Sequence, residues 1–183
     1  MTTDLLVSAA GSWQESWDWA WQRHTNELSW YIRPLFLVPM AWAAYRRSAW
    51  GIAISLLALV TSMAWFPAPA VPDAQVLAFV EFEQDWLTGD WTAGKVALSS
   101  LVPLSLGAYC AAFWQRSLGW GLVVLNGMAL GKILWAVVNE DGGVAVVVPA
   151  LVGLAIGDAA VLAAQNWSLR RRRPESASAH AVH

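Results

Sequence analysis

The residues most able to do chemistry are a few polar side chains inside otherwise apolar stretches. Asp158 is the most unusual of them, because a carboxylate inside a membrane helix costs roughly 2.5–3.5 kcal/mol and usually faces other helices. Depth along each helix places Asn126 level with Asp158, and Ser55 and Ser105 at a similar depth. We therefore expect an inner polar layer of these four residues. It would serve either as a relay or ligand site for a proton, ion or solute, or as a structural hydrogen-bonded cluster.

Three cations fall in the outer halves of three apolar stretches, away from the inner polar layer: Arg33, Lys95 and Lys132. Arg33 and Lys95 are close enough to the predicted surface for their long side chains to reach water. Lys132 is deeper and needs a partner, and Glu83 is the candidate because it falls on the apolar face of an amphipathic segment. We expect one of two arrangements, an anion-attracting vestibule under an acidic lid, in which Glu83 meets Lys132 or Lys95, or a structural ion pair.

Signatures of metal, cofactor and catalytic sites are missing from the sequence. His24 is the only histidine before the C-terminal tail, and one histidine without nearby cysteines is a poor metal or haem ligand. It is expected in the membrane interface beside tryptophans. No nucleophile–base pair, phosphate loop or zinc spacing is present. We therefore predict no catalytic residue, no cofactor and no metal, and the run Arg170–Arg173 is expected to contact lipid headgroups rather than nucleic acid.

These side chains must be positioned by membrane helices. Hydrophobic residues make up 57% of the 183-residue chain, and charged residues 13%, about half the globular norm of roughly 25%. A helix needs about 20 apolar residues to cross the hydrocarbon, and helices satisfy their own backbone there. The apolar stretches are Trp30–Tyr45, Ala49–Phe66, Trp91–Trp114, Leu118–Val138 and Val144–Ala164. We predict an all-α membrane protein with about five transmembrane helices.

Charged residues predict the orientation of these helices. Arg46 and Arg47, Arg116, and Arg170–Arg173 all fall on one side of five crossings. The acidic residues collect on the other side: Asp4, Glu15, Asp18, Glu27, Asp73, Glu81, Glu83, Asp85, Asp90, Glu140 and Asp141. The positive-inside rule then places the N-terminus outside and the C-terminus in the cytoplasm. We expect a multi-pass protein of the cell membrane, and its preference for arginine over lysine favours a bacterial plasma membrane.

Two segments are amphipathic rather than spanning, Leu6–His24 and Asp73–Leu87. Each places aromatic and aliphatic residues on one helical face and carboxylates off it. Both are typical of helices that lie on the outer membrane surface or cap the bundle.

An internal repeat is also predicted. The motif Pro34-Leu35-x-Leu37 recurs as Pro103-Leu104-x-Leu106, and further matches follow at nearly the same spacing. We predict two parallel units of surface helix plus hairpin, at about residues 5–66 and 73–138, followed by a fifth helix at about 143–166. Residues 1–167 form one transmembrane domain, and residues 168–183 form a basic, disordered tail.

Glycine spacing predicts how the last two helices pack. Gly127 and Gly131 are four residues apart, as are Gly153 and Gly157, and such pairs let membrane helices approach closely. The two pairs lie at matching depths, so we expect the fourth and fifth helices to form a tight antiparallel pair through facing glycines.

Two functions remain open from the sequence. The first is a small-solute, ion or proton transporter or channel with an intramembrane site around Asp158. The second is a non-catalytic membrane subunit or scaffold, acting as a homo-oligomer or with a partner membrane subunit. In either case the lipid bilayer is the expected surrounding, and enzymatic activity is not expected.

Overall fold

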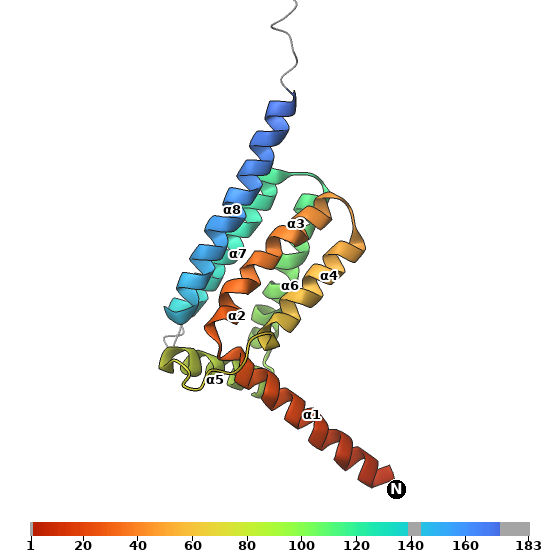
Figure 1. Ribbon diagram of the computed structural model, residues 1–183, viewed down its shortest axis with the longest axis vertical. Helices are drawn as coiled ribbons and strands as arrows, with labels where there is room; N and C mark the ends of the chain where they lie inside the picture. The colour runs from red at the N-terminus through yellow and green to blue at the C-terminus, as the bar shows by residue number, and fades with distance from the viewer. Residues whose placement is uncertain (1, 139–143, 173–183) are drawn as a thin grey trace, which may run out of the picture.

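The computed structural model describes residues 2–138 and 144–172, and these residues fold as helices joined by short connections (Figure 1). The elements are α1 Thr2–His24, α2 Glu27–Ile32, η1 Arg33–Phe36, α3 Leu37–Tyr45, α4 Ala49–Thr61, η2 Ser62–Ala64, α5 Ala74–Thr88, α6 Ala93–Trp114, α7 Leu118–Val138 and α8 Val144–Arg172. No strand occurs within the described ranges, which confirms the all-α prediction. Helix α8 continues through Arg172, into the segment predicted as a tail. The acidic pair Glu140 and Asp141 and the tail from residue 173 lie outside the described residues.

Three helices of the described chain are long and apolar enough to cross a membrane: α6, α7 and the stretch Ala145–Trp167 of α8. This finding supports a membrane location. The other two apolar stretches are less regular. Helix α4 and η2 together give a shorter apolar segment, Ala49–Ala64, and the first stretch is divided into α2, η1 and α3. Pro34 stands in η1, and a proline without an amide hydrogen disturbs the helical hydrogen-bond ladder at that point.

The hairpins α3–α4 and α6–α7 turn by the same backbone structure. In each turn an arginine takes a left-handed conformation, Arg47 with φ 56° and Arg116 with φ 60°. Its amide donates to the carbonyl three residues back at 2.8 Å in both turns, and the amide of the next serine donates to the carbonyl five residues back at 2.9 and 3.0 Å. Those serines, Ser48 and Ser117, accept a backbone amide at the start of the following helix. Each turn thus combines a helix C-cap with an N-cap.

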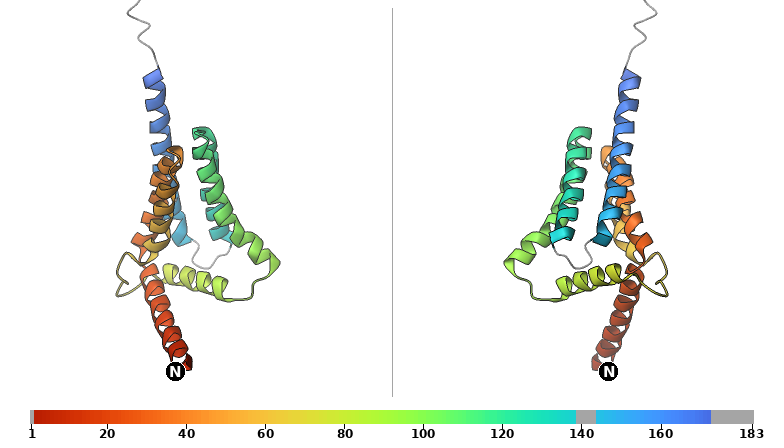
Figure 2. Two further views of the ribbon diagram at one scale, coloured as in Figure 1. Left: turned by 90° about the vertical axis from the view of Figure 1, so that its right-hand side faces the viewer. Right: turned by 90° about the vertical axis from the view of Figure 1, so that its left-hand side faces the viewer.

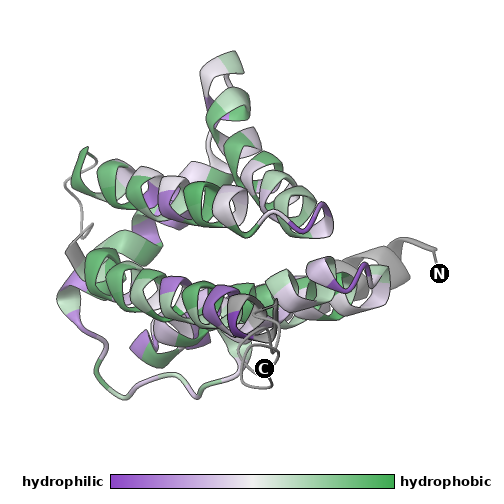
Figure 3. Ribbon diagram, turned by 90° about the horizontal axis from the view of Figure 1, so that it is seen from above, coloured by the Kyte–Doolittle hydropathy of each residue, from purple (hydrophilic) through white to green (hydrophobic). Residues whose placement is uncertain are grey.

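The two hairpins lie beside α8, with both turns at the end where α8 finishes (Figure 1). Helix α7 packs against α6 and α8, and α3 packs against α4 and α6. Helix α5 lies across the opposite end of the bundle (Figure 2). Apolar residues cover most of the long helices, as expected for surfaces that face lipid (Figure 3).

Buried apolar side chains form two clusters, one at each end of the bundle. The cluster near the hairpin turns consists of Met40, Ala41, Ala44, Tyr109, Phe113, Leu125 and Val161. The cluster near α5 consists of Trp21, Trp30, Val76, Phe79, Val80, Ala136 and Val146. The second cluster attaches α5 and the end of α1 to the spanning helices.

The two predicted surface helices are helical, but they are placed differently. Helix α5 buries Val76 and Phe79 of its predicted apolar face against the bundle. Over residues 11–24, helix α1 buries side chains only in its last turn, among them Trp21 and His24, while Trp13 is 72% exposed. Helix α1 therefore projects away from the bundle instead of capping it (Figure 1).

The predicted glycine contact between α7 and α8 is wrong in its details, although these helices do pack together. A Cβ added at Gly127 or Gly131 would meet no atom within 4 Å. A Cβ at Gly157 would lie 2.8 Å from Leu125 of α7, whereas one at Gly153 would overlap the ring of Pro34 of η1. The glycines of α8 thus admit bulky side chains of two different neighbours, and those of α7 face away from α8.

Candidate functional site: a cavity beneath α5

A cavity of about 340 Å³ lies between the two hairpins and α8, on the side covered by α5. Its walls are mostly aliphatic and include Leu37, Leu106, Met128 and Leu154. Four ionisable residues also line it: His24, Arg33, Glu83 and Lys132. Small-molecule sites combine these features, apolar walls with a few convergent polar groups, in volumes of about 300–1,000 Å³.

His24 is held by the sharp connection between α1 and α2. Thr25 donates its hydroxyl to the Gln22 carbonyl at 2.8 Å, and the side chain of Asn26 accepts the Leu28 amide at 3.0 Å as the N-cap of α2. The indole of Trp30 donates to the His24 carbonyl at 2.9 Å. These contacts bring the histidine, only 3% exposed, to the head of the cavity.

The imidazole of His24 stands in a ring of aromatic neighbours. Its centroid lies 5.4 Å from that of Trp21 and 5.7 Å from that of Trp30. The sequence prediction that His24 sits beside tryptophans is therefore confirmed. Its hydrogen bonds to charged residues were not predicted.

Arg33, His24 and Glu83 form a continuous hydrogen-bonded chain. Arg33 Nη2 lies 2.8 Å from His24 Nδ1, and His24 Nε2 lies 2.9 Å from Glu83 Oε2. A guanidinium can only donate, so Nδ1 of His24 must accept. The ring is then neutral, with its proton on Nε2 donated to Glu83. In this way a residue of α1 joins η1 to α5.

The environment of His24 favours this neutral form. Burial lowers the pKa of His24, and the positive charges of Arg33 and Lys132 lower it further. The hydrogen bond and charge of Glu83 act in the opposite direction, but they do not outweigh these effects, and the pKa lies below its ordinary value.

Glu83 is the negative member of the cluster. Burial by itself raises the pKa of Glu83, but the hydrogen bond from His24 and the nearby positive charges of Lys132 and Arg33 outweigh it. The pKa of Glu83 therefore lies below its ordinary value, and the carboxylate is ionised at neutral pH. One negative charge then faces two cations, which leaves the head of the cavity with a net positive charge.

Lys132 reaches this cluster from α7. Its charge acts on both His24 and Glu83, and its side chain lines the cavity. Within the described residues no hydrogen bond joins its ammonium to another group. The carboxylate of Glu83 lies within the electrostatic reach of Lys132, but the described residues show no ion pair between the two, and His24 is its hydrogen-bond partner.

Lys95 takes no part in the cluster. Its ammonium donates to the Gly89 carbonyl at 2.9 Å and lies 4.9 Å and 5.5 Å from the ring centroids of Trp91 and Trp86. Lys95 therefore anchors the connection between α5 and α6, and it does not line the cavity.

The predicted inner polar layer contains only one of its expected contacts. Asn126 donates to Asp158 Oδ1 at 3.0 Å, so the two residues do meet at the same depth. Ser55 instead donates to the Gly51 carbonyl of its own helix at 2.8 Å, and Ser105 to the Val102 carbonyl at 2.9 Å. Neither Asn126 nor Asp158 lines the cavity.

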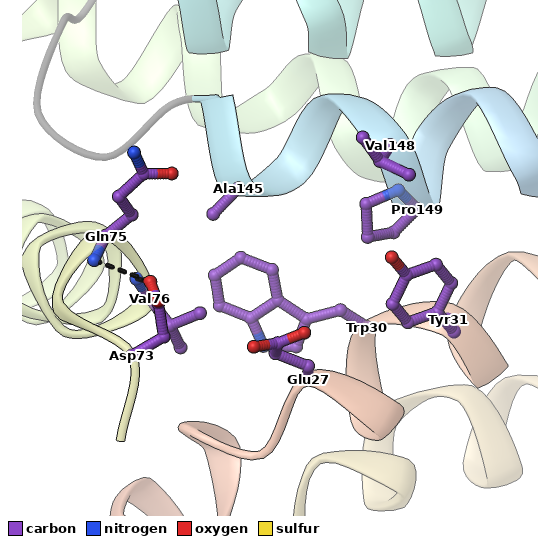
Figure 4. A pocket seen from close by; sticks show the side chains of 9 residues that line it. All are labelled: Glu27, Trp30, Tyr31, Asp73, Gln75, Val76, Ala145, Val148 and Pro149. Carbon is purple, nitrogen blue, oxygen red and sulfur yellow. Dashed lines mark hydrogen bonds between the residues drawn. The ribbon is translucent and has the colours of Figure 1, made fainter. Parts of the chain in front are cut away.

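A second, smaller hollow of about 240 Å³ lies outside the cavity, between α2, α5 and α8 (Figure 4). Glu27, Tyr31 and Asp73 line it, but one oxygen of Asp73 is already engaged as the N-cap of α5. Trp30 lines both the hollow and the cavity, and it is only 6% exposed. Its indole therefore separates the two spaces.

The arrangement as a whole suits reversible binding of a small anion with an apolar body.

The described residues contain no group of three or more side chains that could hold a metal ion. Comparison with known proteins adds no assignment: the chain matches no protein-family model, no curated protein and no solved structure.

Proposed function

We propose that this protein is a membrane transporter for a small organic anion, which binds in the cavity beneath α5. The observation that carries the proposal is the charge at the head of that cavity. Arg33 and Lys132 supply two positive charges against the single carboxylate of Glu83. In a site with apolar walls, such unbalanced cations favour an anionic ligand, because charged hydrogen bonds are strengthened away from water.

The proposal includes five crossings with the N-terminus outside and the C-terminus in the cytoplasm. The segment from α2 to α3, Glu27–Tyr45, has 19 residues, and at 1.5 Å per residue it reaches about 28 Å, close to the hydrocarbon thickness. It runs beside the long helices in the same bundle (Figure 1). Both hairpin turns, which contain Arg47 and Arg116, and the last turn of α8, which contains Arg170, lie at the end away from α5 (Figure 1). This supports a cytoplasmic position for that end.

A parallel duplication of surface helix and hairpin belongs to the same proposal. Its support is the shared geometry of the two turns, in which Arg47 and Arg116 have the same left-handed backbone and the following serines form the same caps. Two related hairpins around a central cavity are a common plan for small transporters.

Flux across liposomes tests the transport proposal. We would reconstitute the full chain and follow uptake of radiolabelled phenyl phosphate, whose charge prevents passive crossing. We expect uptake with the wild type and a loss of about tenfold or more with Lys132→Gln, since a hydrogen bond to a charged group contributes about 1.5–3 kcal/mol. Lys95→Gln is the matched control, because Lys95 lies outside the cavity. Absence of uptake, or equal uptake by Lys132→Gln, contradicts the proposal.

One observation favours the second function, a membrane subunit or scaffold. Helix α1 projects from the bundle and exposes Trp13 and Trp19. Exposed aromatic residues on a projecting helix suit contact with another protein. Native purification would then recover a companion chain in fixed ratio, whereas a homogeneous preparation of this chain alone would contradict the scaffold role.

A further inference from the structure

The cavity beneath α5 is positively charged at one end and apolar along the rest of its length. We propose that its ligand is a single-chain amphiphile with a carboxylate or phosphate head, which enters sideways from the membrane. This inference rests on the proposed function, because it names the substrate class of the same site. Three features carry it: the excess of cationic groups at the head, the length of the apolar part, and the position of the rim.

The head of the cavity has more cationic donor groups, Arg33 and Lys132, than anionic acceptors, of which Glu83 is the one that lines it. Glu83 Oε2 accepts from His24, and Arg33 contacts His24 through Nη2 at 2.8 Å and through Nη1 at 3.5 Å. Arg33 and Lys132 both line the cavity. An anionic head can accept from both cations at once, whereas a cationic head would meet two like charges.

The apolar part of the cavity fits one short chain. From Lys132 the lining continues along α7 through Met128 to Leu125, seven residues away, or about 10 Å along a helix. Leu106 of α6 and Leu154 of α8 face the same space. A volume of about 340 Å³ lies near the lower limit for small-molecule sites, so a two-chain lipid does not fit.

The rim of the cavity lies at the depth of the hydrocarbon. Val102 lines the cavity and is 63% exposed, and it stands near the middle of the spanning helix α6. The aqueous side offers an unfavourable path, because Trp30 separates the cavity from the outer hollow, which is lined by the carboxylates of Glu27 and Asp73. An anionic amphiphile already dissolved in the membrane therefore has the direct path, past Val102.

Photolabelling of the full chain in liposomes tests this inference. The probe is decanoate carrying a diazirine at the end of its chain. We expect labels on cavity-lining residues of α6 and α7, such as Leu106 and Met128, and labelling reduced about tenfold by Lys132→Gln. Lys132 is the preferred position because, within the described residues, its ammonium makes no hydrogen bond that the substitution would break. Labelling that is equal in wild type and Lys132→Gln overturns the inference.

Competitors identify the headgroup chemistry. Decanoate without diazirine and decyl phosphate should displace the probe, and the stronger of the two identifies the preferred head. Decyltrimethylammonium should not compete, because it repeats the chain with the opposite charge. Displacement by decyltrimethylammonium overturns the inference, because it shows that the negative charge of the head is not required. Equal displacement by inorganic phosphate alone also overturns it, because it shows that the apolar chain is not required.

A pair of matched variants tests the lateral path. Val102→Trp should slow labelling severalfold by filling the rim, whereas Leu101→Trp, at an exposed neighbour that does not line the cavity, should not. Equal rates for the two variants contradict entry past Val102. The outcome is separable from the flux experiment: labelling of the cavity without phenyl phosphate uptake refutes transport alone, and uptake without cavity labelling refutes the amphiphile alone.

Discussion

Acidification should loosen the contact between α5 and the bundle through His24. The neutral ring accepts from Arg33 through Nδ1 and donates to Glu83 through Nε2. Protonation removes the acceptor and places a third positive charge beside Arg33 and Lys132. The charge of Glu83 offsets this change only in part, because the folded-state pKa of His24 lies below its ordinary value of 6.5.

The sign and size of the effect follow from proton linkage. A group whose pKa is lower in the folded state than in the unfolded state binds more protons when unfolded, so stability falls as the pH falls. The contribution of His24 is complete well above pH 6.5 and is lost on acidification toward its folded pKa. Between pH 7.5 and 5.5 the loss reaches up to about 1.4 kcal/mol. Glu83 adds a loss of the same sign only near pH 4.5 and below.

Equilibrium unfolding in mixed micelles at several pH values between 7.5 and 5.5 measures this loss. His24→Gln should remove most of the pH dependence, because glutamine does not titrate. The control is a variant in which the other two histidines, His180 and His183, are replaced by glutamine, and it should keep the wild-type slope. The reasoning is refuted if wild type and His24→Gln lose stability equally, or if acidification stabilises the wild type.

Three further substitutions test the packing and the assignment of the site. Glu83→Gln should lower the free energy of unfolding by about 1.5–3 kcal/mol, because it removes the charged acceptor of the buried His24. The exposed Glu81→Gln should change it by less than about 0.5 kcal/mol. Equal unfolding curves for the two variants would contradict the role of Glu83. Gly153→Ala should lower the free energy of unfolding by about 1–3 kcal/mol, because the added methyl group would clash with the Pro34 ring. Gly127→Ala has open space around it and should leave that free energy unchanged or slightly raised in the same unfolding titration. Asp158→Asn should leave phenyl phosphate uptake within about twofold of wild type, because the new side chain can still accept from Asn126 and lies outside the cavity. Loss of uptake would instead indicate that the transport site includes the Asp158 carboxylate.

Depth along a helix could be predicted from the sequence, but rotation about its axis could not. Matched depth correctly paired Asn126 with Asp158, and the same reasoning wrongly paired Gly127 and Gly131 with the glycines of α8. Successive helical residues point about 100° apart. Since Leu125 and Asn126 face α8, the neighbouring Gly127 has to point elsewhere.

The serines of the predicted polar layer show a second limit. Ser55 and Ser105 do lie in apolar helices, but each hydroxyl donates to a carbonyl of its own helix. This local bond is available to any serine in a helix, so a serine at a suitable depth does not by itself indicate a contact between helices.

His24 shows what a tertiary contact adds to the sequence reading. The pattern placed Glu83 on the inner face of α5, where it lines the same cavity as Lys132. It gave no reason to place His24 between Arg33 and Glu83, because the three residues come from three different elements. The signal in the sequence was that His24 ends the amphipathic segment Leu6–His24, on the face that carries its tryptophans.

The most direct test of the account is the affinity of the purified protein for phenyl phosphate. Calorimetric titration of wild type, Lys132→Gln and Lys95→Gln compares a cation of the cavity with one outside it. We predict binding by the wild type and Lys95→Gln with similar Kd, and a Kd raised about tenfold or more in Lys132→Gln. No binding by the wild type, or the same Kd for Lys132→Gln, would contradict an anion site beneath α5.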